Sequence, residues 1–120
     1  GRRIFGRALC EYQGVRWMFA ELIARARLLE SLMLSTISGT EATGTLDPVA
    51  AAVAKLSGAE LAQKAAWTAM QVMGGSGFSS GSRIERLSRD ARVLEVGAGA
   101  REVLYDYLGE QLLKRYCEKP

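Results

Sequence analysis

Apolar residues recur every three or four positions along most of this chain, and glycine or proline interrupts them at a few places. This spacing lays an apolar stripe along one face of a helix. The pattern predicts four helices and no strand, with the helices expected at residues 8–37, 48–73, 84–96 and 101–117. Two long and two shorter helices joined by short loops favour an antiparallel four-helix bundle, so the expected fold class is all-α.

Glycine, proline and an acidic residue set the expected helix ends. Gly39 and the Thr/Gly-rich residues 40–45 end the first helix. Asp47 and Pro48 begin the second, because aspartate accepts hydrogen bonds from the free N–H groups of a first turn and proline fits that turn. Residues 74–77, Gly-Gly-Ser-Gly, end the second helix, since glycine readily adopts the left-handed terminal conformation.

The first helix carries a wider apolar surface than one face requires. Leu28, Leu29, Leu32, Met33, Leu34 and Ile37 spread around its second half. A helix of this kind buries a second side against a partner. We therefore expect an oligomer.

The composition excludes several classes of site. The chain has 120 residues, 48% hydrophobic and 24% charged, which suits one globular domain. It has no histidine, so the commonest metal ligand and the usual general base at neutral pH are missing. Cys10 and Cys117 stand near opposite ends and make no zinc site by themselves. We expect no metal site and no Ser-His-Asp hydrolase.

Charge and hydropathy indicate where such a chain works. The net charge is +3, and the basic residues are scattered, so no nucleic-acid partner is expected. No apolar run approaches the roughly 18 residues of a membrane span, and no signal-peptide pattern opens the chain. With free thiols, these features favour a cytoplasmic location. The chain begins with Gly1 rather than Met, so we expect a piece of a longer protein.

Two local patterns are candidates for ligand contact. Gln71 and residues 74–77 mark a helix end that opens into a glycine-rich loop, where a ligand can approach the backbone closely. The loop lacks the Lys-Ser/Thr of a phosphate loop and does not follow a strand, so a plain cap and turn remains an alternative. Arg2 stands near Phe5 and Gly6, a combination suited to phosphate or adenine. A frayed, charged terminus is the alternative there.

Five short motifs occur in order along residues 2–115. They are Arg2-x-x-Phe5-Gly6, Glu11-Tyr12-Gln13, Gln71-x-x-Gly74-Gly75-x-Gly77-Phe78, Arg89-Asp90-Ala91-Arg92 and Gly99. Together they resemble the C-terminal helical domain of the acyl-CoA dehydrogenases. The set is specific, because the glycine-rich loop followed by Arg-Asp-Ala-Arg is hard to match by chance at this spacing.

The resemblance implies that residues 1–120 are one helical-bundle domain at the C-terminal end of a longer flavoenzyme. Family members are homotetramers, built as dimers of dimers, with a helical domain and a β-domain before this bundle. They bind FAD and catalyse the α,β-dehydrogenation of an acyl-CoA thioester in fatty acid metabolism. The resemblance implies acyl-CoA as substrate and an electron-transferring flavoprotein as electron-transfer partner.

The resemblance also assigns cofactor contacts. Arg2 would contact the FAD pyrophosphate from across the dimer, with Phe5 packing nearby and Gln13 holding the adenosine half. The residues of the glycine-rich loop that would touch the same cofactor are Gln71, Gly74 and Gly75. In the last loop, Ala100 and Glu102 match positions that approach FAD, and Ala98 and Gly99 match positions beside the substrate.

Ala98 departs from the family pattern. In many members a glutamate, the catalytic base, stands immediately before the glycine that corresponds to Gly99, and alanine accepts no proton. The chain therefore supplies no catalytic residue at this position. A loop like that of isovaleryl-CoA dehydrogenase would account for this, because the base of that enzyme lies on a preceding helix, here upstream of Gly1.

Three alternatives to such a loop stay open. In the first, the chain belongs to a non-catalytic partner subunit of a hetero-oligomer. In the second, it belongs to a related flavoenzyme with altered chemistry, such as one that acts on a substrate bound to a carrier protein. Outside the enzymes, a helical oligomerisation module without cofactor fits the same apolar pattern.

Overall fold

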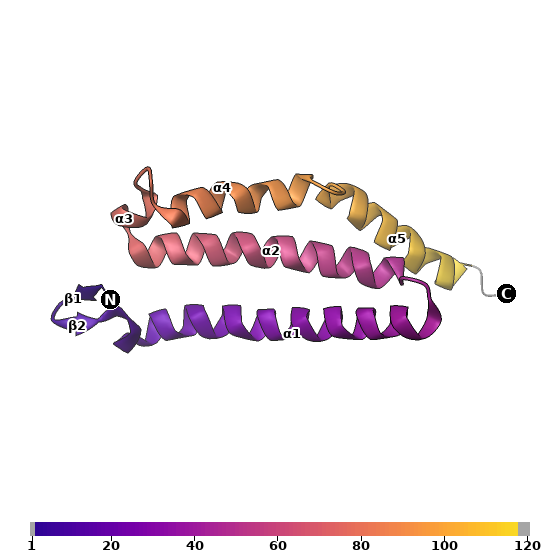
Figure 1. Ribbon diagram of the computed structural model, residues 1–120, viewed down its shortest axis with the longest axis horizontal. Helices are drawn as coiled ribbons and strands as arrows, with labels where there is room; N and C mark the ends of the chain where they lie inside the picture. Colours follow the sequence, from indigo (N-terminus) through magenta and orange to yellow (C-terminus); the bar gives the residue numbers. More distant parts are fainter. Residues whose placement is uncertain (1, 118–120) are drawn as a thin grey trace.

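Three rows of helices make up the molecule, with the second long helix in the middle (Figure 1). The computed structural model describes residues 2–117, apart from the side chain of residue 115. Its elements are β1 (Arg3–Ile4), β2 (Arg7–Ala8), the 3₁₀ turn η1 (Leu9–Glu11), α1 (Gln13–Thr43), α2 (Pro48–Met73), α3 (Gly75–Phe78), α4 (Arg83–Val96) and α5 (Arg101–Cys117). The predicted all-α class is confirmed.

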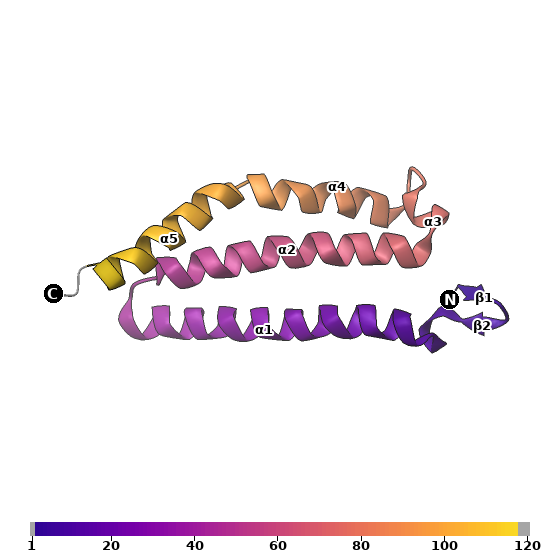
Figure 2. The ribbon, with the colours of Figure 1, turned by 180° about the vertical axis from the view of Figure 1, so that it is seen from behind.

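α2 is the element on which the others are assembled. It runs antiparallel to α1 on one side, while α4 and α5 follow one another along its other side, as both views show (Figures 1 and 2). The two shorter helices thus share one row of the bundle. α2 begins where the sequence predicts, because Asp47 Oδ1 accepts hydrogen bonds from the N–H groups of Val49 at 2.9 Å and Ala50 at 3.2 Å.

The expected bounds of the first helix are wrong at both ends. α1 continues through Gly39 to Thr43, where Gly44 takes a left-handed φ of 71° and donates its N–H to the Thr40 carbonyl. Glycine inside a helix weakens it only modestly, whereas the left-handed cap suits glycine specifically. At the other end the helix begins at Gln13 rather than at residue 8, because a turn precedes it.

Before that turn, η1, residues 3–8 form a short antiparallel hairpin, and the expectation of no strand is wrong there. Arg3 pairs with Ala8 and Ile4 with Arg7, which leaves Phe5 and Gly6 as a two-residue loop. Both loop residues have positive φ, 48° and 75°. This is the backbone that the tight type I′ hairpin turn requires. Strands of two residues are too short to show the alternation that reveals a strand in a sequence.

The buried core is small and lies along α2. Its buried apolar residues are Ala52, Leu56 and Ala59 of α2 and Ala91 of α4, each 5–6% exposed. The radius of gyration is 18.6 Å, whereas a compact domain of this length has about 14 Å. The accessible surface is 8742 Å², about 2,400 Å² more than expected for a compact monomer of this mass.

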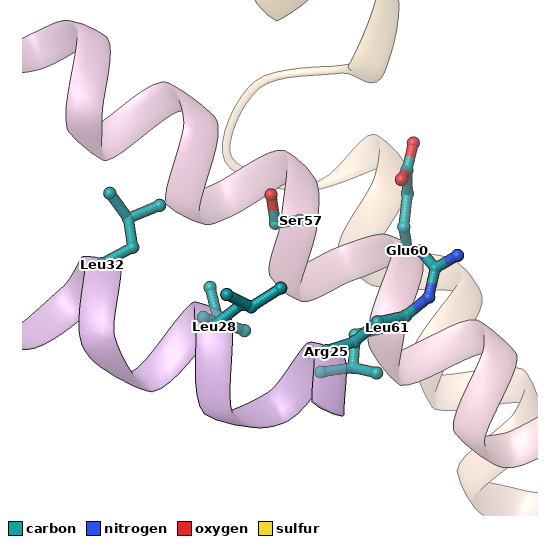
Figure 3. Close-up of a pocket in the computed structure, with 7 residues that line it drawn as sticks. Arg25, Leu28, Leu32, Ser57, Glu60 and Leu61 are labelled. Carbon is teal, nitrogen blue, oxygen red and sulfur yellow. The ribbon is translucent and has the colours of Figure 1, made fainter. Parts of the chain in front are cut away.

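α1 carries much of this excess surface, since none of its residues is buried. Its large apolar side chains with at least a third of their surface exposed are Trp17, Met18, Phe19, Ile23, Leu28, Met33, Leu34 and Ile37. A pocket of about 220 Å³ opens between α1 and α2 (Figure 3). It is lined by Arg25, Leu28, Leu29, Leu32, Ser57, Glu60 and Leu61. The interface between α1 and α2 is therefore loosely packed.

Candidate functional site

Arg2 and the glycine-rich segment after α2 lie together at one end of the molecule. Arg2 Nη1 donates a hydrogen bond to the carbonyl of Val72 at 3.2 Å, across 70 positions of sequence. Gly74 lies two residues after Val72, with φ 61° and ψ −146°. A Cβ at Gly74 would overlap Arg2 Nη1 and would lie 3.1 Å from Arg2 Cζ. Glycine at this position is therefore what allows the guanidinium to lie against the backbone.

The hairpin holds Arg2 in this position. The Leu9 N–H donates to the Arg2 carbonyl at 3.1 Å, and the Tyr12 hydroxyl donates to the Ile4 carbonyl at 2.7 Å. These bonds tie the hairpin to the start of α1. Since α1 runs beside α2, the hairpin reaches the C-terminal end of α2 (Figure 1).

The glycine-rich segment is a helix cap and a short turn, which is the alternative to an open ligand loop that the sequence leaves available. The Gly74 N–H closes α2 on the Met70 carbonyl at 2.8 Å, the Gly77 N–H donates to the Gly74 carbonyl at 2.9 Å at the start of α3, and the Ser79 N–H closes α3 on the Gly75 carbonyl at 3.1 Å. Gly77 is buried, and a Cβ there would come within 2.8 Å of Met73 Cβ. Gly75 is exposed, with nothing within 4 Å of where its Cβ would be.

Grooves flank Arg2 and Gly74. One, of about 400 Å³, is lined by Trp67, Met70, Gln71, Gly74, Gly75 and Phe78. A second, of about 390 Å³, lies between the hairpin, α1 and the end of α2, and Arg2 is part of its wall. Trp67 is 63% exposed, so it belongs to the groove rather than to the core. Its place on the apolar stripe of α2 hides this role in the sequence.

The remaining residues predicted for this cofactor contact, Phe5 and Gln13, lie at the same end of the molecule. Phe5 is 94% exposed at the tip of the hairpin. Gln13 is the first residue of α1 and is exposed. The structure thus brings together Arg2, Gln71, Gly74 and Gly75, and it places Phe5 and Gln13 on their margin.

The other predicted residues lie in the loop between α4 and α5. Ala98 and Gly99 both have positive φ, 55° and 102°. Ala98 is exposed, Gly99 and Ala100 are half-buried, and Glu102 is exposed in the first turn of α5. Backbone bonds close the loop at each end, from the Gly97 N–H to the Val93 carbonyl at 2.7 Å and from the Leu104 N–H to the Ala100 carbonyl at 3.1 Å.

Lys55 of α2 lies against this loop, and the sequence gives no sign of it. Its Nζ donates to the carbonyl of Leu94 at 2.7 Å and to that of Gly99 at 2.8 Å. Carbonyls in the last turn of a helix have no partner within the helix and attract a positive charge. The ammonium therefore satisfies the end of α4 and the loop at once.

An ion-pair network fixes the start of α5 beside the same loop. Arg101 pairs with Glu60 of α2 at 2.9 Å and with the buried Glu95 of α4 at 3.5 Å. Glu95 also pairs with Arg92, and the Tyr105 hydroxyl donates to Glu60 at 2.9 Å. Hydrogen bonding to Tyr105 and the two carboxylates raise the pKa of Arg101, so it stays charged.

The two groups of predicted residues are far apart. Lys55 and Gly74 are 19 residues apart on or just beyond α2, which corresponds to about 28 Å along a helix axis. The loop with Ala98 and the cluster around Arg2 are therefore separate places on this chain.

Among residues 2–117, His, Cys, Asp and Glu nowhere gather in a group of three or more that could hold a metal ion. Over the same residues, no helix combines the length and apolar character that crossing a membrane requires.

Residues 1–113 match the family model for the acyl-CoA dehydrogenase C-terminal domain. The chain belongs to the acyl-CoA dehydrogenase family. It is 31% identical, over 93% of its length, to 3-sulfinopropanoyl-CoA desulfinase of Advenella mimigardefordensis, and 34% identical, over 96%, to an acyl-[acyl-carrier-protein] dehydrogenase of a Mycobacterium strain.

Solved structures of the family share the fold. A protein of Mycobacterium smegmatis described as an acyl-CoA dehydrogenase matches 92% of this chain with a TM-score of 0.84 and 28% identity, and this chain covers 29% of it. The chain likewise spans 27% and 29% of the two curated relatives. The shared region is thus the C-terminal domain of longer acyl-CoA dehydrogenase family proteins.

Proposed function

We propose that this chain is the C-terminal domain of a longer FAD-dependent enzyme that dehydrogenates an acyl thioester between its α and β carbons. In that enzyme the domain contacts FAD and builds the oligomer. The observation that carries the proposal is the Arg2 guanidinium held against Gly74, beside the exposed Gln71 and Gly75. Family membership supports it, and these residues stand in the motifs by which the sequence resembles the family.

The chemistry of the Arg2 cluster suits a diphosphate. A guanidinium has five N–H donors, and Arg2 uses Nη1 for the Val72 carbonyl while remaining exposed. Arginine binds phosphate oxygens with two parallel, charge-assisted hydrogen bonds. At Gly74 a side chain would fill the space that the guanidinium occupies. The residues present therefore fit the diphosphate of FAD, which supplies the hydride acceptor when it is bound.

The oligomer proposal rests on exposed apolar surface. The excess of about 2,400 Å² over a compact monomer lies within the roughly 1,000–2,500 Å² that each partner contributes when an obligate interface buries about 2,000–5,000 Å² in total. A neighbouring subunit or domain would cover the exposed apolar side chains of α1. It would also cover Phe5, which lies on a hairpin turn with positive φ. A homotetramer arranged as a dimer of dimers is the proposed assembly.

The catalytic base is proposed to come from outside this chain. Ala98 offers a methyl group where many family members carry glutamate, and methyl accepts no proton. An acyl-CoA would be the substrate and an electron-transferring flavoprotein the electron acceptor.

A second candidate is a related flavoenzyme that acts on a different substrate, and the names of two relatives favour it. The chain is similar to proteins named 3-sulfinopropanoyl-CoA desulfinase and acyl-[acyl-carrier-protein] dehydrogenase. A substrate carrying a sulfinate or a carrier protein is therefore the alternative.

Flavin binding by the polypeptide that carries this domain tests the proposal. We expect a yellow protein with flavin absorbance and bleaching of an electron-acceptor dye with an acyl-CoA. Replacing Arg2 by Ala is expected to lower FAD affinity at least about tenfold, because a hydrogen bond to a charged group contributes about 1.5–3 kcal/mol. Arg3→Ala is the matched control, since the Arg3 guanidinium bonds to the Gly6 carbonyl within the hairpin.

Three results would count against the proposal. A protein that stays colourless after FAD addition would favour the helical module without cofactor. Equal FAD affinity in wild type and Arg2→Ala would remove Arg2 from the diphosphate site. A yellow protein that is inactive with acyl-CoA but active with a sulfinate or a carrier-bound substrate would favour the second candidate.

A further inference from the structure

We propose that Lys55 is a positioning residue that fixes the loop of residues 97–100 on α2 and thereby sets the geometry of the reaction. The part that concerns the loop rests on the structure, and the part that concerns the reaction rests on the proposed function.

The backbone of this loop needs an external support. Ala98 and Gly99 are consecutive residues with positive φ, and Ala98 has a side chain that disfavours this conformation. Such a backbone persists only where the surroundings hold it. Ala98 is exposed, so packing of its own side chain contributes little.

Lys55 supplies this support from a rigid element. It is half-buried in α2, eight positions into that helix, and its Nζ bridges two carbonyls that are five residues apart, at Leu94 and Gly99. One ammonium thus sets the distance between the Leu94 carbonyl in the last turn of α4 and the carbonyl of Gly99, the residue after Ala98. Without it, the Gly99 carbonyl could rotate toward solvent.

A second tie from α2 holds the far end of the loop. Glu60, five residues after Lys55, pairs with Arg101, the first residue of α5. The loop is therefore bonded to α2 at both ends, and Lys55 makes the bond to Gly99, in the part of the loop with positive φ. Because the Arg2 cluster lies about 28 Å away along the helix, a change at Lys55 leaves that cluster in place.

Lys55→Met in the holoenzyme tests the proposal, with Lys64→Met as the matched control. Methionine keeps an apolar stem of similar length and removes the three donors. Lys64 lies on the same helix and pairs with Glu21 of α1, away from the loop. Hydrogen exchange measured by mass spectrometry follows the amides of Gly97 and Leu104, whose bonds close the loop at each end.

We expect Lys55→Met to raise exchange at Gly97 and Leu104 at least tenfold, and to lower kcat at least tenfold with KM and FAD content unchanged. A residue that only stabilised the fold would shift the unfolding temperature without this split between kcat and KM. Lys64→Met is expected to leave the exchange at both amides and kcat as in wild type. Unchanged exchange at both amides in Lys55→Met would overturn the proposal.

The wild type provides a measurement that does not depend on the folding of a variant. Gly97 is expected to exchange at least tenfold more slowly than Ser82, whose amide closes a turn onto the Ser79 carbonyl before α4. Equal rates at the two amides would also overturn the proposal. If the wild type binds no flavin or turns over no acyl thioester, the proposed function fails, while the exchange data still decide whether Lys55 fixes the loop.

Discussion

Replacing Gly74 by Ala tests whether the Arg2 cluster needs glycine for its backbone conformation, as distinct from any effect of glycine on helix stability. At φ 61° and ψ −146°, Gly74 occupies a region that is nearly closed to residues with a Cβ, and the strain is about 1–3 kcal/mol. The new methyl group would also displace the Arg2 guanidinium and break its bond to the Val72 carbonyl, a further contribution of about 1 kcal/mol. We expect the free energy of unfolding to fall by about 2–4 kcal/mol.

Urea unfolding of the polypeptide that carries the domain measures this change, with Gly39→Ala as the control. Gly39 lies inside α1, and nothing lies within 4 Å of where its Cβ would be. Alanine is the better helix former there, so Gly39→Ala is expected to raise the free energy of unfolding by about 0.5–1 kcal/mol. Replacing glycine by alanine should therefore lower the free energy of unfolding at Gly74 and raise it at Gly39.

FAD titration adds a test of the route by which Gly74 acts. If the methyl group harms binding by displacing Arg2, then Gly74→Ala should have little further effect on FAD affinity in an Arg2→Ala background. Fully additive losses would refute this reasoning. A Gly74→Ala protein as stable as wild type, with wild-type FAD affinity, would refute the backbone part as well.

Two further predictions concern catalysis and pH. Ala98→Glu is expected not to raise dye-bleaching activity with an acyl-CoA, because the base comes from elsewhere, and an inactive wild type rescued by this change would contradict that. The hydrogen bond from Lys64, with a smaller contribution from Arg25, lowers the pKa of Glu21. The stability that this ion pair contributes is therefore present above the ordinary carboxyl pKa and is lost as the pH falls through the lowered pKa. Glu21→Gln should therefore lower stability to urea at neutral pH and have no effect below the carboxyl range, and an equal loss at both would count against it.

The helices could be predicted from the sequence where local signals agree. α2 has an apolar period, an Asp47 cap, a proline in its first turn and glycine after its end, and its bounds follow. α1 is less predictable, because Gly39 resembles a stop in the sequence and Gly44, five residues later, takes the left-handed cap. The hairpin before α1 depends on tertiary bonds such as that from Tyr12 to the Ile4 carbonyl, which no periodicity reveals.

The candidate site divides in the same way. Arg2 and Gly74 stand in motifs that the family resemblance identifies, and the structure adds that they touch. Lys55 has no such signal, because its partners are backbone carbonyls 39 and 44 residues away, and every residue type has a carbonyl. Only the packing of α4 against α2 brings them within reach.

Polar contacts with α2, rather than burial, determine where both parts of the candidate site lie. Few side chains are fully buried, so the hydrophobic core leaves the hairpin and the loop of residues 97–100 weakly constrained. Exposed ion pairs and hydrogen bonds add little to the free energy of folding, typically at most about 1 kcal/mol each. They do select one geometry among those that the core permits. Substitutions at Lys55 or Arg2 should therefore change what the enzyme does more than how stably it folds, whereas Leu56, which is in the core, should show the reverse.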